Sequence, residues 1–191
     1  MQIRQFIATA WHTVFEASAQ LNGTTRSVLN TYFAQCMNGM LNCLFSEETL
    51  ASGTLLSISN SVNTVLESCD HENLKSELFT ICEFIYNKVT EFNNASQTST
   101  LNMEQRELFI NNWCSSLQPC LVRVGSEGIT DQMLSLFIDL AINIFQMYGK
   151  VMNGGLFILH GLITTVDHRI TPFLHKFIDY IVCSMRMENC D

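Results

Sequence analysis

The stretch GLFILHGLITTVDHRITPFLHKFIDYIVCSM, residues 155–185, indicates the fold most directly. Its second half places apolar side chains at offsets 0, 3, 4, 7, 8, 11, 12 and 15 from Ile170, which is the spacing of one face of an α-helix. Thr171 before Pro172 suits a helix cap followed by the first helical position, where the missing N–H of proline costs nothing. The sequence therefore predicts a final amphipathic helix over 170–187.

Apolar periodic stretches and short polar breaks alternate in the same way along the whole chain. Breaks such as Gly125-Ser126-Glu127-Gly128 and Gly149 to Gly155 separate them. Two prolines and nine glycines are too few for the frequent tight turns of a barrel or sandwich. We expect an all-helical chain with eight helices, near 2–20, 24–45, 47–68, 73–92, 102–123, 130–148, 153–166 and 170–187.

Two of the expected helices are apolar on more than one face. Residues 74–92 carry one stripe from Leu74 to Phe92 and a second that contains Phe79, Cys82 and Tyr86. The helix over 132–148 is apolar around most of its circumference. A helix inside a stack needs both stripes, whereas a helix on the outside of a bundle needs one, so a stack is favoured.

Alternate helix starts, at 24, 73, 130 and 170, recur at an average of about 49 residues, close to the ~40–47 residue period of HEAT and armadillo units. We therefore predict a single α-solenoid over 1–191, with about four HEAT-like antiparallel helix pairs in a right-handed superhelix. A closed eight-helix bundle remains the rival architecture. The approximate pairs are 1–45, 46–92, 101–148 and 153–188.

Charge and composition restrict the partners. Ten basic and 18 acidic residues give a net charge of −8, which opposes direct binding to nucleic-acid phosphates and favours basic partners. Charged residues make up 15% of the chain, below the ~25% of a typical soluble domain, so much of the surface is expected to lie against protein. No stretch approaches the ~20 apolar residues of a spanning helix, and we expect no membrane insertion.

Eight cysteines occur at irregular spacings, mostly within apolar helical stretches. Cys36 and Cys43, seven residues apart, share one helical face, where a free thiol packs as a small hydrophobic group. We expect reduced thiols, because long cytosolic chains rarely rely on disulfide frameworks.

Catalytic and metal chemistry has little support in the sequence. The spacing of His160, His168 and His175 matches no common zinc pattern, and Cys183 has no C-x-x-C partner. Phosphate-loop, dinucleotide, nucleophile-elbow and zincin motifs are missing from the sequence. We expect no enzyme, no catalytic residue, no metal and no cofactor. The alternative in this class is a compact helical hydrolase with a cysteine or histidine site.

Residues 155–167 and 170–185 resemble a repeat boundary of the importin-β family of nuclear transport receptors. That family joins a small-residue inner helix, through a polar turn, to an outer helix with an aromatic-x-Pro-aromatic-Leu-x-x-Phe pattern, and Pro172, Phe173 and Leu174 fill matching positions here, as does Phe177. The order of segments, with the polar loop at 93–100, resembles the middle to C-terminal half of importin-β. The resemblance implies a piece of about four repeats from a longer superhelix.

What this resemblance implies is nuclear protein import, with residence in the cytoplasm and nucleus and at the nuclear envelope and pore. The implied partners are a basic import signal or an importin-α-like adaptor, FG nucleoporins and, for a full-length receptor, the small GTPase Ran. The family's N-terminal Ran-binding repeats and acidic loop have no counterpart in this sequence. Another HEAT scaffold, of the phosphatase-regulatory type, is the alternative among interaction proteins.

Importin-β-like receptors bind basic ligands along the inner wall of the array, so acidic residues on the expected inner helices are the candidate contacts. An aromatic ring there can carry the stem of a lysine or arginine. The candidates are Glu47, Glu48, Glu67, Glu104, Glu107 and Trp113.

Overall fold

A computed structural model describes residues 6, 7, 9–11, 13, 14, 17, 23–46, 55–69, 72–94, 101–146, 153–178 and 182. No strand occurs among these residues, which confirms the prediction of an all-helical chain. None of the described helices combines the length and the apolar character needed to cross a bilayer. The elements are α2 (Gly23–Leu44), α4 (Leu55–Ser68), α5 (Lys75–Asn94), α6 (Met103–Gly128), α7 (Asp131–Gln146), α8 (Asn153–Val166) and the 3-10 helix η3 (Asp167–Phe173).

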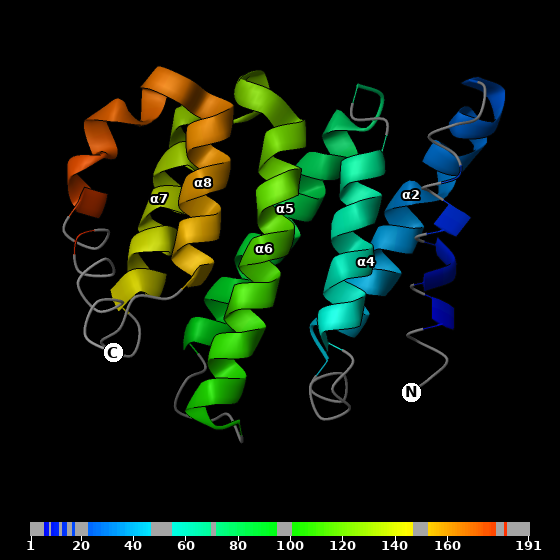
Figure 1. The fold of residues 1–191 in the computed structure, drawn as a ribbon. Helices are drawn as coiled ribbons and strands as arrows, with labels where there is room; N and C mark the ends of the chain where they lie inside the picture. Colours follow the sequence, from blue (N-terminus) through cyan, green and yellow to red (C-terminus); the bar gives the residue numbers. More distant parts are fainter. Residues whose placement is uncertain are drawn as a thin grey trace.

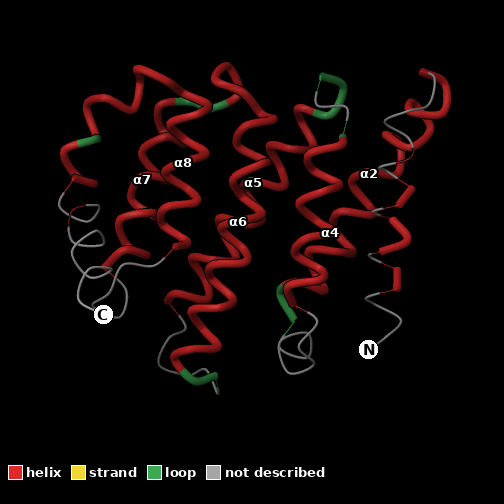
Figure 2. Tube along the Cα trace, in the orientation of Figure 1, coloured by secondary structure: helices red, strands yellow, loops and turns green. Residues whose placement is uncertain are grey.

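The described helices form two layers (Figure 1). One layer holds α4, α6 and α8 side by side, and the other holds α2, α5 and α7, so the chain alternates between the layers. Helices α2 and η3 lie at opposite ends of the row, which makes the described part an open row of helices (Figure 2). The expected inner helices 47–68, 102–123 and 153–166 correspond to the layer of α4, α6 and α8.

Packing between the layers joins helices across the boundaries of the predicted pairs. Helix α5 packs along α6, and α7 packs along α8, more extensively than α4 along α5 or α6 along α7. The predicted pairs 46–92 and 101–148 group the helices differently. The packing between helices follows their apolar stripes and not the length of the loops that connect them. Only Ile129 and Thr130 connect α6 to α7, yet these two helices make few contacts with each other.

Both helices that were predicted to be covered on several sides are buried in that way. In α5, Leu78 and Ile85 of the first stripe and Cys82 of the second are buried. In α7, Phe137 meets Tyr86 of α5 with ring centroids 5.6 Å apart, and Phe145 meets Phe177 beyond η3 at 6.2 Å. Helix α7 therefore packs against α5, against α8 and against the segment after η3.

Three glycines set how closely α8 approaches its neighbours. Helix α8 has the predicted bounds 153–166, so the polar break ends before Asn153 and does not extend through Gly155. A Cβ on Gly154 would meet Ile110 and Cys114 of α6 at 3.2 Å, and one on Gly161 would meet Leu121 of α6 at 3.2 Å. On the other side, a Cβ on Gly155 would lie 3.1 Å from the Ala141 carbonyl oxygen of α7. Glycine is used in α8 for close helix packing.

The predicted final helix starts differently in the structure. Residues 167–173 form η3, and Pro172 lies inside it, so the predicted cap at Thr171 is wrong. A 3-10 helix turns about 120° per residue, whereas an α-helix turns about 100°. Over the seven residues of η3, the side chains that follow are therefore rotated by roughly 140° about the helix axis, relative to a continuous α-helix. Ile170 and Phe177 of the predicted stripe are buried, but Ile178 and Val182 are exposed. Residues 179–181 and 183–187 are outside the described residues.

We predict opposite effects for Gly155→Ala and Gly39→Ala. The new methyl at 155 would press on a backbone carbonyl and on the Phe145 ring, whereas nothing lies within 4 Å of the position at Gly39 in α2. Gly155→Ala should lower the free energy of unfolding by about 1–2 kcal/mol, and Gly39→Ala should raise it by about 0.5–1 kcal/mol. Urea unfolding monitored by circular dichroism measures both, and stabilisation by both substitutions would contradict the close approach of α8 to α7.

The described cysteines form no disulfide with one another. Cys43 is half-buried, and the others are buried: Cys36, Cys69, Cys82, Cys114 and Cys120. Cys183 and Cys190 lie outside the described residues. Burial raises the pKa of Cys36 from 9.0 to about 11 and also raises that of Cys114. The pKa of Cys120 is raised by burial and by the neighbouring Cys82 and Cys69.

These thiols should react slowly in the folded protein at pH 8 and rapidly once it is denatured. Titration with a thiol reagent in denaturant, without reductant, should count close to the eight cysteines of the sequence, and a count near zero would refute the reduced state.

Because the folded-state pKa of Cys36 exceeds its unfolded value, the unfolded chain loses this proton first. The free energy of unfolding should therefore fall as the pH rises from 9 toward 11.

Candidate partner-binding surface

The first turn of α6 is fixed by a reciprocal cap. Asn102 Oδ1 accepts from the Gln105 backbone N–H at 2.8 Å, and Gln105 Oε1 accepts from the Asn102 backbone N–H at 3.1 Å. This capping box satisfies two of the amide groups that a helix start leaves without partners. It holds Glu104 in the first turn of α6, where a negative charge is favourable.

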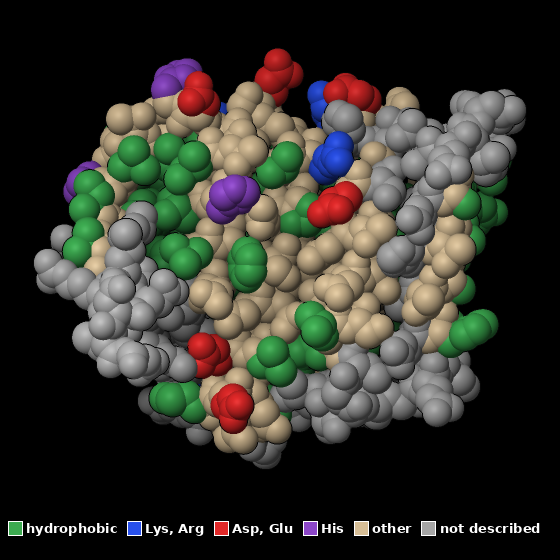
Figure 3. Space-filling view, in the orientation of Figure 1, with side chains coloured by type: hydrophobic (Ala, Val, Ile, Leu, Met, Phe, Trp, Pro, Cys, Tyr) green, Lys and Arg blue, Asp and Glu red, His purple; other side chains and the backbone are tan. Residues whose placement is uncertain are grey.

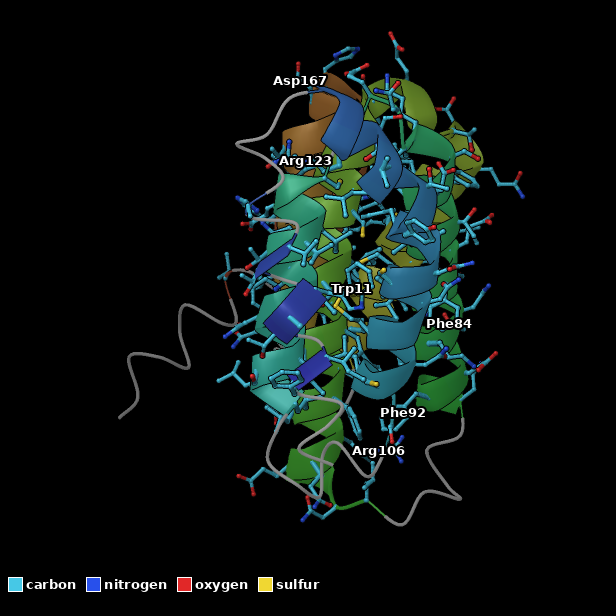
Figure 4. The ribbon with its side chains drawn as sticks, turned by 90° about the vertical axis from the view of Figure 1, so that its right-hand side faces the viewer. Trp11, Phe84, Phe92, Arg106, Arg123 and Asp167 are labelled. Carbon is cyan, nitrogen blue, oxygen red and sulfur yellow. The ribbon has the colours of Figure 1, made fainter. Side chains whose placement is uncertain are left out.

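Arg106 attaches this end of α6 to α5. Its guanidinium is buried, donates to the Phe92 carbonyl oxygen at 3.2 Å and lies 5.0 Å from the centroid of the Phe92 ring. Figure 4 shows the two residues together near one end of the helices. The sequence reasoning missed Arg106, although it occurs three and seven residues before Phe109 and Trp113, at the spacing of the buried stripe.

An open hollow lies next to this anchored end. It has a volume of about 600 Å³ and is lined by Met103, Glu104, Glu107, Leu108 and Asn111. Met103 and Leu108 are 55% and 47% exposed, so the hollow presents apolar surface beside its carboxylates. In the space-filling view, acidic and hydrophobic side chains lie beside one another where α6 begins (Figure 3). We call this the acidic hollow. It brings together two of the predicted contact residues.

The other predicted acidic residues do not join them. Glu67 is exposed at the end of α4, where its backbone carbonyl accepts from Arg123 at 2.6 Å. Arg123 is nineteen residues beyond Glu104 on α6, roughly 28 Å along the axis, and lies toward the opposite end of the layer (Figure 4). Glu47 and Glu48 fall outside the described residues.

The prediction that Trp113 offers a surface platform is wrong. The side chain is 2% exposed, and its indole N–H donates to the Leu44 carbonyl oxygen at 3.2 Å. Its ring centroid lies 4.3 Å from Phe45 and 4.8 Å from each of Phe92 and Phe109. These rings come from the residue after α2, from α5 and from α6, so Trp113 is buried where these three elements meet.

A second groove crosses α4, α6 and α8 on the same face. Its volume is about 430 Å³, and its lining includes five asparagines: Asn60 and Asn63 of α4, Asn111 and Asn112 of α6, and Asn153 of α8. Asn111 also lines the acidic hollow, so the two are adjacent. We call this second groove the amide groove. The sequence reasoning missed it, because asparagines on alternate helices become neighbours only once the layer is known.

The histidines do not assemble a site. His160 Nδ1 lies 2.7 Å from Gln118 Nε2, which links α8 to α6, and His168 and His175 are exposed. Within the described residues, no three His, Cys, Asp or Glu side chains are placed to hold a metal ion. The surface chemistry on this face is that of carboxylates, amides and exposed apolar groups.

Comparison with protein-family models, with curated proteins and with solved structures found no match to this chain.

The burial of Trp113 predicts its fluorescence. A Trp11→Phe variant leaves Trp113 as the single tryptophan of the chain. Its emission should be blue-shifted and weakly quenched by acrylamide. The reciprocal Trp113→Phe variant reports half-buried Trp11 and should be quenched more strongly. Equal quenching of the two variants would contradict the buried position of Trp113.

Proposed function

We propose that this chain is a helical-repeat binding protein of the importin-β type, which recognises basic segments of partner proteins and acts by binding, not by catalysis. The observation that carries the proposal is the acidic hollow, where Glu104 and Glu107 lie beside exposed Met103 and Leu108. The open two-layer row of helices supports an array of HEAT-like pairs, because each layer offers one continuous face.

The chemistry of the hollow matches lysine and arginine side chains. Their ammonium or guanidinium group meets the carboxylates of Glu104 and Glu107, while their aliphatic stems cover the apolar surface of Met103 and Leu108. Each exposed ion pair contributes only about 0.2–1 kcal/mol. Several contacts are therefore needed for useful affinity, and a single hollow should bind weakly, with a dissociation constant on the order of tens of micromolar or weaker.

In this proposal the chain serves nuclear protein import, shuttling between cytoplasm and nucleus through the pore. The basic ligand is an import signal or an importin-α-like adaptor, and FG nucleoporins and Ran are partners of the whole receptor. The net charge of −8 supports a basic ligand, because it attracts positive charge and so increases the association rate.

The test is a titration of a fluorescent basic import-signal peptide into the wild-type chain and into a Glu104→Lys, Glu107→Lys variant. We expect the double variant to bind at least tenfold more weakly, because attraction becomes repulsion. Binding to the wild-type chain should weaken from 0.1 M to 1 M salt, as the Debye length shrinks from about 10 Å to about 3 Å.

The matched control is Glu77→Lys with Glu83→Lys. It changes the net charge equally and also alters one glutamate in the first turn of a helix, but on α5 in the other layer. This control should retain most of the affinity. If both double variants and the wild type bind equally at all salt concentrations, the acidic hollow is not the binding site.

A further inference from the structure

We propose that the amide groove binds the main chain of an extended segment of the partner, immediately beside the acidic hollow. This inference deepens the proposed function, since it states how a basic segment is held between its charged side chains. It predicts that recognition depends on the peptide backbone as well as on lysine and arginine.

The amides in this groove have unused hydrogen-bonding capacity. Asn63 Oδ1 is buried and accepts no hydrogen bond in the part of the chain that the structure describes. Buried polar atoms are rarely left unpaired, because they have lost their hydrogen bonds to water without a replacement. Asn63 lines the groove and is partly exposed, so turning its amide outward would let this acceptor meet a donor from a ligand.

Asn111 is held in an orientation that leaves its NH₂ group available. Its Oδ1 accepts from the Gly154 backbone N–H of α8 at 2.7 Å. The close approach of Gly154 to α6 makes this bond possible. The same side chain then offers its Nδ2 donors, and since Asn111 lines both the amide groove and the acidic hollow, it marks where the two meet.

The main chain of a polypeptide is the ligand that matches these groups. A primary amide carries both donors and an acceptor, and each residue of an extended segment presents one N–H and one C=O. The groove is lined by amides and hydroxyls, including Ser59 and Ser115, whose oxygens lie 3.5 Å apart. Uncharged groups of this kind suit a neutral backbone better than a phosphate or a metal ion.

The spacing of the helices fits an extended segment. Packed helices lie about 8–10 Å apart, and three extended residues span about 10 Å. A segment that crosses α4, α6 and α8 would therefore meet asparagines at every third residue or so, over about six residues. Leu56, 63% exposed, and the half-buried Phe157 also line the groove and offer apolar contacts to side chains between them.

The experiment compares two peptides against two double variants. One peptide has about twelve residues of alternating lysine and serine, and the other has the same sequence with alternate backbone nitrogens methylated, which removes N–H donors but keeps every charge. The variants are Asn60→Ala with Asn63→Ala in the groove, and Asn87→Ala with Asn143→Ala, which are exposed on α5 and α7 in the other layer. Fluorescence polarisation measures affinity, and circular dichroism melts check that each variant folds.

For the wild type and the outer-layer variant, we expect backbone methylation to weaken binding about tenfold. The groove variant should bind the unmodified peptide about tenfold more weakly, and methylation should then have little further effect, which is the coupling expected of groups in contact. Equal affinity of the wild type for the two peptides overturns the amide groove but leaves salt-dependent binding at Glu104 and Glu107 intact. A methylation effect without salt dependence overturns the acidic hollow alone, and a lack of binding by either peptide overturns both proposals.

Discussion

The hydrogen bond from the Trp113 indole to the Leu44 carbonyl oxygen is the contact around which the described structure is arranged. Leu44 is the last residue of α2, where backbone carbonyls have no partner within the helix. The indole satisfies one of them from α6, while its ring packs on Phe45, Phe92 and Phe109. One side chain thus connects the end of α2, the end of α5 and the middle of α6, and it does so without a charged group.

This arrangement explains why the candidate surface occurs where it does. With Trp113 turned inward, the neighbouring turns of α6 present Glu104, Glu107 and Asn111 to the hollow on the other side of the helix. Arg106 on the inward side satisfies the Phe92 carbonyl, so its positive charge is used within the core. The same helix is therefore both the centre of the core and the richest part of the candidate surface.

Much of the helical content and the alternation of layers could be predicted from the sequence, because apolar periodicity records which faces are buried. The two stripes around Ile85 and Cys82 are one example. Periodicity could not place Trp113, since an aromatic residue on an inner helix fits both core and surface. Periodicity also could not predict η3, whose tighter winding rotates the residues that follow it. Nor could it predict the amide groove, because the asparagines that meet there come from different helices and are more than forty residues apart in the sequence. The start of α8 at Asn153 agrees with the predicted helix over 153–166, and the break drawn through Gly155 overlapped it because Gly154 and Gly155 serve packing inside the helix.

The glycines of α8 also have a mechanical consequence. Helices α6 and α8 approach so closely that they have little room to slide or separate, and they should move as one rigid body. The lateral contacts of α2 with α5 and of α5 with α7 are much sparser. A row with one stiff side and one compliant side bends most easily by opening or closing the compliant side. Flexure of such an array would change its curvature while preserving the spacing of α6 and α8, so a ligand held there would keep its register as the rest of the molecule adapts to it.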